Sequence, residues 1–313
     1  MTDNCALALK IDVDTLKGYR EGLPRLLDML KRRGIRASIF FSMGPDNSGK
    51  AVRRIFRRGF LSKMLRTRAP STYGLKTLLY GTLLPAPMIV ESDPGLLRRA
   101  VDEGHDCGVH AWDHVFWQDR LPSLSREAVR EQFTRSMELF ERVSGTAPAC
   151  CAAPGWQTTP DALAVQDELG FAYCSDVRGT GPSLPRVFLP RMGGTTFRTP
   201  QIPSTLPTLD ELWGTDGLDA DTVNDRYLDL LEPGVNVHTI HTEMEGGAMS
   251  GVFEALLDAC LEGEMAFMTL REVLAGAAAT VDGGAAPLPV SEVVMREIPG
   301  RAGTLAVQQA AEG

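Results

Sequence analysis

Short apolar segments alternate with amphipathic helical segments along most of the chain, and this alternation restricts the fold more than any other feature. The segment CALALKID at 5–12 is typical of a buried strand, and 24–33 has the periodicity of a helix that ends at Gly34. Further strands are expected at 35–43, 107–109, 149–153, 171–174, 235–240 and 265–268, and further helices at 94–103, 125–144, 161–168, 222–231, 252–261 and 270–274. Strands separated by helices form parallel β/α units, so we expect an α/β fold built on a parallel sheet.

Length and composition favour one large globular domain. The chain has 313 residues, of which 43% are hydrophobic and 23% are charged, and these values exclude wholesale disorder. We expect a single domain over residues 1–277, with an insertion at about 47–90. The chain from Ala275 to Gly313 is rich in Ala and Gly, so we expect 278–313 to be a C-terminal tail that is partly disordered.

The N-terminus and the cysteines favour a cytoplasmic protein. The chain begins MTDNCALALK, which lacks the basic stretch and long apolar core of a secretory signal. The six cysteines, at 5, 107, 150, 151, 174 and 260, show no CxxC pairing, and we interpret them as reduced core thiols. No run of 18 apolar residues occurs, so we expect no membrane-spanning helix.

The residues able to perform chemistry gather where predicted strands end. The strand at 5–12 leads into Asp12-Val13-Asp14, the strand near 107 leads into His110, and the strand at 235–240 ends in His238-Thr239-Ile240-His241. Functional groups of parallel β/α folds gather at the carboxyl ends of strands. All five histidines lie in two clusters, one within 104–114 and one within 238–241. This clustering favours a functional site.

Two histidines and a carboxylate form a candidate metal site. His110 and His114 are four residues apart, and on a helical turn this spacing places both rings on one face. Asp12 and Asp14 alternate along a strand, so their side chains face the same side. Two neighbouring carboxylates require a cation between or beside them. Two histidines, one carboxylate and an open position make a common catalytic metal set.

Such a site is typical of a hydrolase. A bound divalent ion polarises a carbonyl oxygen and lowers the pKa of water to about 7. The aspartate that does not bind the metal accepts the proton of the water, and His241 or His238 protonates the leaving group. The sequence therefore predicts a metal, a base and an acid in one site.

The motifs that carry these residues resemble, in their order along the chain, those of the polysaccharide deacetylase family (NodB homology, carbohydrate esterase family 4). The matching segments are Asp12-Val13-Asp14, His110-Ala111-Trp112-Asp113-His114, Ala153-Pro154-Gly155-Trp156, Asp176 and Ile240-His241. Within the family, the segments GVHAWDHVFWQ and TIHTEMEGG look most like a branch that deformylates a lipid-linked sugar. The resemblance covers about residues 5–300 and includes the insertion.

The resemblance implies a distorted (β/α)7-type barrel with a basic, apolar helical insertion. It implies that one divalent ion (Zn, Mn or Co) is bound by Asp14, His110 and His114. Asp12 is then the general base, and His241 is the general acid, with Asp176 as the nearest residue to tune it. The substrate wall would include Pro154, Gly155 and Trp156.

The implied substrate is a formamido-arabinose carried on undecaprenyl phosphate. Its free amine serves lipid A modification and polymyxin resistance. The alternative is a deacetylase of another N-acylated sugar or polysaccharide. Glu243 and Glu245, just past His241, are either surface charges or ligands of the amine or of a sugar hydroxyl, and we assign Glu243 to substrate binding.

The sequence departs from the family pattern in its first and third motifs. Val13 separates two aspartates that are adjacent in the wider family. The third motif usually opens with an arginine that orients the base, and Ala152 stands at about that place. Arg178, after the next predicted strand, is a candidate to replace it.

The insertion is strongly basic although the whole chain has a net charge of −8. Residues 47–90 contain nine Lys or Arg and no Asp or Glu. A helix over 52–60 would place Arg53, Arg54, Arg57 and Arg58 opposite an apolar face. We interpret the insertion as a surface that binds the anionic inner face of the bacterial inner membrane. The alternative is a helix that packs on the barrel with solvated arginines, and no nucleic-acid partner is expected.

A phosphate-binding loop is the main rival interpretation. The segment 44–50, GPDNSGK, fits the G-x4-G-K pattern of P-loop nucleotide hydrolases. Ala51 stands where the Mg²⁺-binding Ser or Thr belongs, and Asp46 would lie among the phosphates. Both departures disfavour nucleotide binding.

Overall fold

The computed structural model describes residues 5–51, 76–179, 181, 184, 186–278 and 287–310. The predicted helix over 52–60, with Arg53, Arg54, Arg57 and Arg58, lies outside the described residues. The described ends of the insertion, 47–51 and 76–90, contact each other, because Gly49 N–H donates to Tyr80 O at 3.0 Å.

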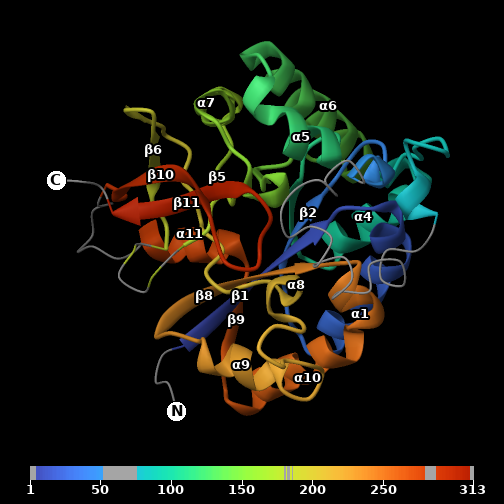
Figure 1. Ribbon diagram of the computed structural model, residues 1–313, viewed down its shortest axis with the longest axis vertical. Helices are drawn as coiled ribbons and strands as arrows, with labels where there is room; N and C mark the ends of the chain where they lie inside the picture. Colours follow the sequence, from blue (N-terminus) through green and yellow to red (C-terminus); the bar gives the residue numbers. More distant parts are fainter. Residues whose placement is uncertain are drawn as a thin grey trace.

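A parallel sheet forms the centre of the molecule (Figure 1). Its strand order is β5-β4-β3-β2-β1-β8, and β9 pairs with the first half of β1. The strands are β1 (Cys5–Val13), β2 (Ser38–Phe41), β3 (Asp106–Val109), β4 (Cys150–Cys151), β5 (Tyr173–Cys174), β8 (Gly234–His241) and β9 (Ala266–Met268). Every pairing in this sheet is parallel, which confirms the predicted α/β class.

Residues 201–206 connect the two edges of this sheet. Ile202 N–H donates to Cys174 O in β5, and Thr205 and Leu206 N–H both donate to Val237 O in β8. These bonds replace a regular ladder between β5 and β8. The sheet therefore curves into the distorted barrel that the family resemblance implies.

Helices cover the outside of the sheet (Figure 1). They are α1 (Leu23–Arg32), α4 (Pro94–Asp102), α5 (His114–Arg120), α6 (Arg126–Ser144), α7 (Pro160–Leu169), α8 (Leu209–Leu212), α9 (Val223–Asp229), α10 (Ser250–Glu262) and α11 (Leu270–Ala278). In sequence order, α1 packs on α4, α4 on α6, and α6 on α7. The Ser125 hydroxyl caps α6 by accepting from Ala128 N–H, and Gly145 ends α6 with φ of 80°. None of the described helices is long and apolar enough to span a membrane.

A second sheet corrects the prediction of a C-terminal tail for residues 290–310. Its order is β11-β10-β6-β7, and it lies beside β5 (Figure 1). The strands are β6 (Leu189–Met192), β7 (Thr195–Thr196), β10 (Val290–Glu297) and β11 (Thr304–Ala310). The Ala- and Gly-rich composition before residue 287 hid the alternation of apolar residues in VSEVVMRE, which buries Ser291 and Val293 on one face. Backbone bonds join β11 to Arg178, since Arg178 N–H donates to Ala306 O and Gln308 N–H donates to Arg178 O.

Candidate active site and metal centre

The carboxyl ends of β1, β3 and β8 lie together at one end of the central sheet. Asp12 in β1 lies opposite His241 in β8, and Phe41 in β2 lies opposite Val109, the last residue of β3. His110, which follows Val109, therefore lies at the same end of the sheet as Asp12. The parallel register therefore brings Asp12, His241 and His110 together.

Asp14, His110 and His114 converge as the sequence predicted. His110 Nε2 lies 3.3 Å from Asp14 Oδ1, and His114 Nε2 lies 3.3 Å from Asp14 Oδ2. The potential ligand atoms all lie within 4.8 Å of one another. His110 Nδ1 contacts Ala152 O at 2.8 Å, which directs Nε2 toward Asp14. Burial raises the pKa of Asp14, but the charges of His114 and His110 outweigh burial and hold this pKa well below its usual value.

The two histidines do not share a helical turn, which corrects that part of the prediction. His110 follows β3, and His114 is the first residue of α5. Between them, Ala111 has a φ of 74°, and Asp113 caps α5 by accepting from Phe116 N–H at 2.9 Å. The rings nevertheless lie 5.4 Å apart because the loop reverses direction between strand and helix.

The donor set fits a divalent ion. Two imidazole nitrogens and one carboxylate, with space for a further ligand, are typical of catalytic zinc and related metals. The observed Nε2–Oδ contacts of 3.3 Å leave the three donors turned toward one another. Asp14, His110 and His114 can therefore hold such an ion.

Asp12 is buried beside this triad, with 3% of its surface exposed. Its Oδ2 lies 3.4 Å from Lys10 Nζ and 3.9 Å from His110 Nε2. Its Oδ1 has no hydrogen-bond partner within the described part of the chain. One carboxylate oxygen is thus paired, and the other is buried without a hydrogen-bond partner.

Alternation along β8 separates the two candidate acids. His241 faces the same side of the sheet as Asp12, whereas His238 is three positions earlier and faces the opposite side. His238 is buried with its ring 4.5 Å from the Tyr227 ring, and burial lowers its pKa to about 3. The pKa of His241 is also lowered, because the effect of burial outweighs the opposite effect of the Asp14 and Asp210 carboxylates. Only His241 reaches the site.

Asp176 lies deeper in the barrel than predicted. Its Oδ2 accepts from Gln166 Nε2 at 2.6 Å and from Gln201 Nε2 at 3.3 Å. Burial raises the pKa of its carboxyl group. It makes no hydrogen bond or ion pair with His241 among the residues described, so the structure does not bring Asp176 to the acid.

The third motif forms the turn Pro154–Trp156 behind the site. Gly155 has a φ of 58°, and a Cβ there would meet Gln118 Nε2 at 2.2 Å, so this turn disfavours a side chain at position 155. Trp156 is 2% exposed, and its Nε1 donates to Ser204 Oγ at 3.0 Å. Its indole therefore packs beneath the site residues as part of the protein interior. It offers little surface to a substrate.

Two arginines enclose Trp156, and neither replaces the missing arginine of the third motif. The guanidinium carbons of Arg178 and Arg301 lie 4.8 Å and 4.5 Å from the indole ring. Arg178 pairs with Glu211 Oε1 at 2.8 Å and donates to Leu206 O, so it is directed away from Asp12. Arg301, from the loop between β10 and β11, also pairs with Glu211.

Glu243 and Glu245 are both buried, so they are not surface charges. Glu243 Oε1 accepts from Thr15 N–H at 2.8 Å and from Thr15 Oγ1 at 2.6 Å, which fixes the chain just after Asp14. Glu245 Oε2 accepts from His241 N–H at 2.9 Å. Burial raises the pKa of each carboxyl group to about 8. The assignment of Glu243 to direct substrate binding is therefore corrected, because its carboxylate supports the loop.

Sequence reasoning missed Lys10, Glu211 and Arg301. A lysine inside the otherwise apolar strand CALALKID was a signal that could have been used. Nothing local marks the pairing of Glu211 with Arg301, since the two residues are 90 positions apart.

The geometry of the segment 44–50 disfavours the rival interpretation as a phosphate-binding loop. Asp46 is buried, and its Oδ1 and Oδ2 accept from the backbone N–H groups of Ser48 and Leu16. The Ser48 N–H of this loop is already bonded to a carboxylate, which disfavours a phosphate beside it.

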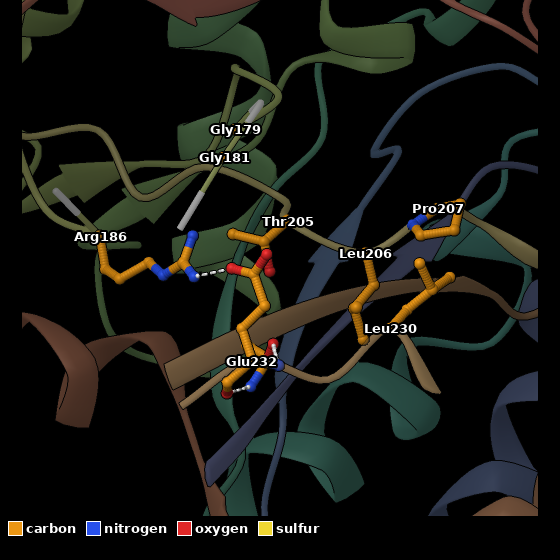
Figure 2. A pocket seen from close by; sticks show the side chains of 9 residues that line it. Gly179, Gly181, Arg186, Thr205, Leu206, Pro207, Leu230 and Glu232 are labelled. Carbon is orange, nitrogen blue, oxygen red and sulfur yellow. Dashed lines mark hydrogen bonds and ion pairs between the residues drawn. The ribbon is translucent and has the colours of Figure 1, made fainter. Parts of the chain in front are cut away.

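A small hollow lies at the other end of β8 (Figure 2). Its lining includes Leu206, Pro207, Leu230 and Asn236, and the ion pair between Arg186 and Glu232 crosses it. Asn236 precedes His241 by five strand residues, or roughly 16 Å. The hollow is thus separate from the candidate active site.

This fold and this site define a class of hydrolase, and the chain belongs to the polysaccharide deacetylase family. The model of that family matches residues 7–174. Members of this deformylase and deacetylase class hydrolyse an amide bond, and the chain is such a hydrolase.

More particular similarity extends over nearly the whole chain. The chain is 38% identical over 303 residues to a probable 4-deoxy-4-formamido-L-arabinose-phosphoundecaprenol deformylase of Shewanella sediminis, covering 96% of this chain and 94% of the relative. It is 29% identical over 299 residues to a protein of the same description in Wigglesworthia glossinidia brevipalpis, covering 93% and 98%.

Solved structures support the fold. A putative polysaccharide deacetylase from Mycobacterium smegmatis matches with a TM-score of 0.60 and 15% identity, covering 91% of this chain and 94% of that one. A probable polysaccharide deacetylase from Pseudomonas aeruginosa PAO1 matches with a TM-score of 0.56 and 15% identity, covering 86% and 89%.

We expect His110→Ala to lower the metal content of the purified protein, because it removes one of three donors. The loss should reach about 10-fold or more in affinity, since even residues behind the metal ligands contribute 10–100-fold. Titration with Zn²⁺, Mn²⁺ and Co²⁺ and elemental analysis measure this. His105→Ala is the control, because His105 is buried elsewhere and its Nδ1 accepts from Ala37 N–H. Equal metal content in both variants would contradict the triad.

Proposed function

We propose that the protein is a metal-dependent deformylase that acts on a formamido-arabinose carried on undecaprenyl phosphate. The observation that carries this proposal is the convergence of Asp14, His110 and His114 beside Asp12 and His241. The named relatives, which span almost the same length, support the choice of a formyl group and a lipid-linked sugar. The product amine then serves lipid A modification and, through it, polymyxin resistance.

Each residue has a role in the hydrolysis of the formamide to formate and an amine. When bound, a divalent ion supplies Lewis acidity to the carbonyl oxygen and lowers the pKa of water. The Asp12 carboxylate accepts the proton of the attacking water as general base, because it lies beside His110 and opposite His241. His241, half-buried opposite Asp12, donates a proton to the departing nitrogen. A lowered pKa makes the His241 imidazolium a stronger acid toward that nitrogen.

The enzyme acts, in this proposal, on the inner face of the bacterial inner membrane as a peripheral protein from the cytoplasm. The described ends of the insertion support this location. Leu83 is 80% exposed and Leu84 is 37% exposed, in a loop with no acidic residue. The other described end of the insertion contacts the site. Asn47 Nδ2 donates to Asp113 Oδ2 at 2.6 Å, one residue before the proposed metal ligand His114. A bilayer that bound this loop would present its lipid near the metal centre.

The proposal is tested by release of formate. Purified protein with Zn²⁺, Mn²⁺ or Co²⁺ is incubated with the formamido-arabinose lipid and, separately, with its acetamido analogue. We expect formate from the first substrate and slower release of acetate from the second. The reverse preference would support the alternative, a deacetylase of another N-acylated sugar.

Substitution of the two histidines of β8 tests the assignment of the acid. We expect His241→Ala to lower kcat by about 10²–10⁴-fold, because general acid catalysis contributes that much. The control His238→Phe keeps a ring against Tyr227 on the other side of the strand, and we expect near-normal kcat. Normal turnover by His241→Ala would remove it from the mechanism.

Flotation with anionic liposomes tests the membrane surface. We expect the double variant Leu83→Ser and Leu84→Ser to bind less, since each exposed leucine loses about 1.5–3 kcal/mol of possible burial. Leu261→Ser is the matched control, because Leu261 is 38% exposed on α10. Equal flotation of the double variant, the control and the unmodified protein would exclude this loop as an anchor.

A further inference from the structure

Lys10 is a fully buried lysine in the middle of β1. Leu7, Leu9 and Ile11 of this strand belong to the large core cluster beneath the helices. Lys10 alternates with these residues and therefore faces the barrel interior, on the same side as Asp12. A charged side chain occupies an interior position that an apolar residue could fill.

Four neighbours hold the ammonium group in place. Lys10 Nζ lies 3.4 Å from Asp12 Oδ2 and donates to Ser175 O at 3.1 Å. It also lies 5.2 Å from the ring of Trp156 and 5.9 Å from the ring of Phe40. These contacts compensate part of the desolvation of the charge, because aromatic faces attract cations and the carbonyl accepts a hydrogen bond.

Fold stability does not explain this lysine. Replacing a buried ion pair by apolar residues of similar volume is often neutral or stabilising. What the pair does fix is the orientation of Asp12. Its Oδ2 is held by Lys10, whereas its Oδ1 is left without a hydrogen-bond partner in the part of the chain that the structure describes.

The other nearby cations are committed elsewhere. Arg178 binds both carboxylate oxygens of Glu211, at 2.8 Å and 3.2 Å, and Arg301 binds the same residue. Among the described lysines and arginines, Lys10 is therefore the one that forms an ion pair with Asp12.

We propose that Lys10 is a positioning residue that holds Oδ2 of Asp12 and so fixes the orientation in which the Asp12 carboxylate acts as base. The inference rests on the proposed function, in which Asp12 is the general base. Lys10 does not touch the substrate or the metal, and its effect on the reaction passes through Asp12.

A double-mutant cycle tests this inference, with formate release from the formamido-arabinose lipid as the assay. We expect Lys10→Met to lower kcat by about 10–10²-fold, because small misplacements of a catalytic group have effects of that size. KM and metal content should change by less than about 3-fold. In the Asp12→Asn background, adding Lys10→Met should change kcat by less than about 3-fold, because the group that Lys10 positions is already lost.

The test also remains decisive if the single variant Lys10→Met fails to fold. If Lys10→Met alone leaves Asp12 as an unpaired buried charge and does not fold, the comparison of Asp12→Asn with the double variant still decides, since both charges are then absent. Arg271→Met is the control, because it removes the cation 2.7 Å from the buried carboxylate of Asp106, at the start of β3. We expect it to lower the melting temperature and to leave kcat within about 3-fold.

Two results would overturn the role of Lys10. One is a normal kcat for Lys10→Met. The other is a fall in kcat that is as large when Lys10→Met is added to Asp12→Asn as when it is made in the unmodified protein. A normal kcat for Asp12→Asn alone would instead contradict the proposed function, because Asp12 would not be the base. The two failures are therefore distinguishable.

Discussion

The parallel pairing of β1 with β2 on one side and β8 on the other is the constraint on which the site depends. This register places Asp12 opposite His241, and the pairing of β2 with β3 brings His110 to the same edge. Because side chains alternate along each strand, a shift of one residue would turn Asp12 or His241 to the helical side. The apolar residues of β1 that pack under the helices fix this register, so the same burial that stabilises the fold also positions the chemistry.

Burial makes the charges of the site depend on one another. Asp12 and Asp14 lie close together and are stabilised by Lys10, His110 and His114. Behind them, Glu211 joins Arg178 and Arg301 around the indole of Trp156. In a medium of low dielectric constant, an unpaired charge costs several kcal/mol, so removing one member of either group leaves its partners destabilised. A metal at Asp14 would add to this balance.

The C-terminal hairpin of β10 and β11 is part of this arrangement. Its residues Leu305 and Val307 pack against Trp156, and its loop supplies Arg301. The family model ends at residue 174, before this hairpin, whereas the relatives named above match over nearly the whole chain. The support beneath Trp156 thus comes from a segment outside the residues that the family model matches.

The sequence by itself determined the alternating strands and helices, the parallel sheet and the grouping of Asp14 with His110 and His114, because hydrophobic periodicity and strand-end motifs are local signals. It also contained, without being used, the fact that His238 and His241 face opposite sides, since three steps along a strand reverse the side chain. Tertiary structure alone decided that Asp176 bonds to Gln166 and Gln201, that Arg178 pairs with Glu211, and that Lys10 pairs with Asp12. The partners of a buried charge are set by which strands and loops pack around it, and no local pattern encodes contacts between residues so far apart in the chain.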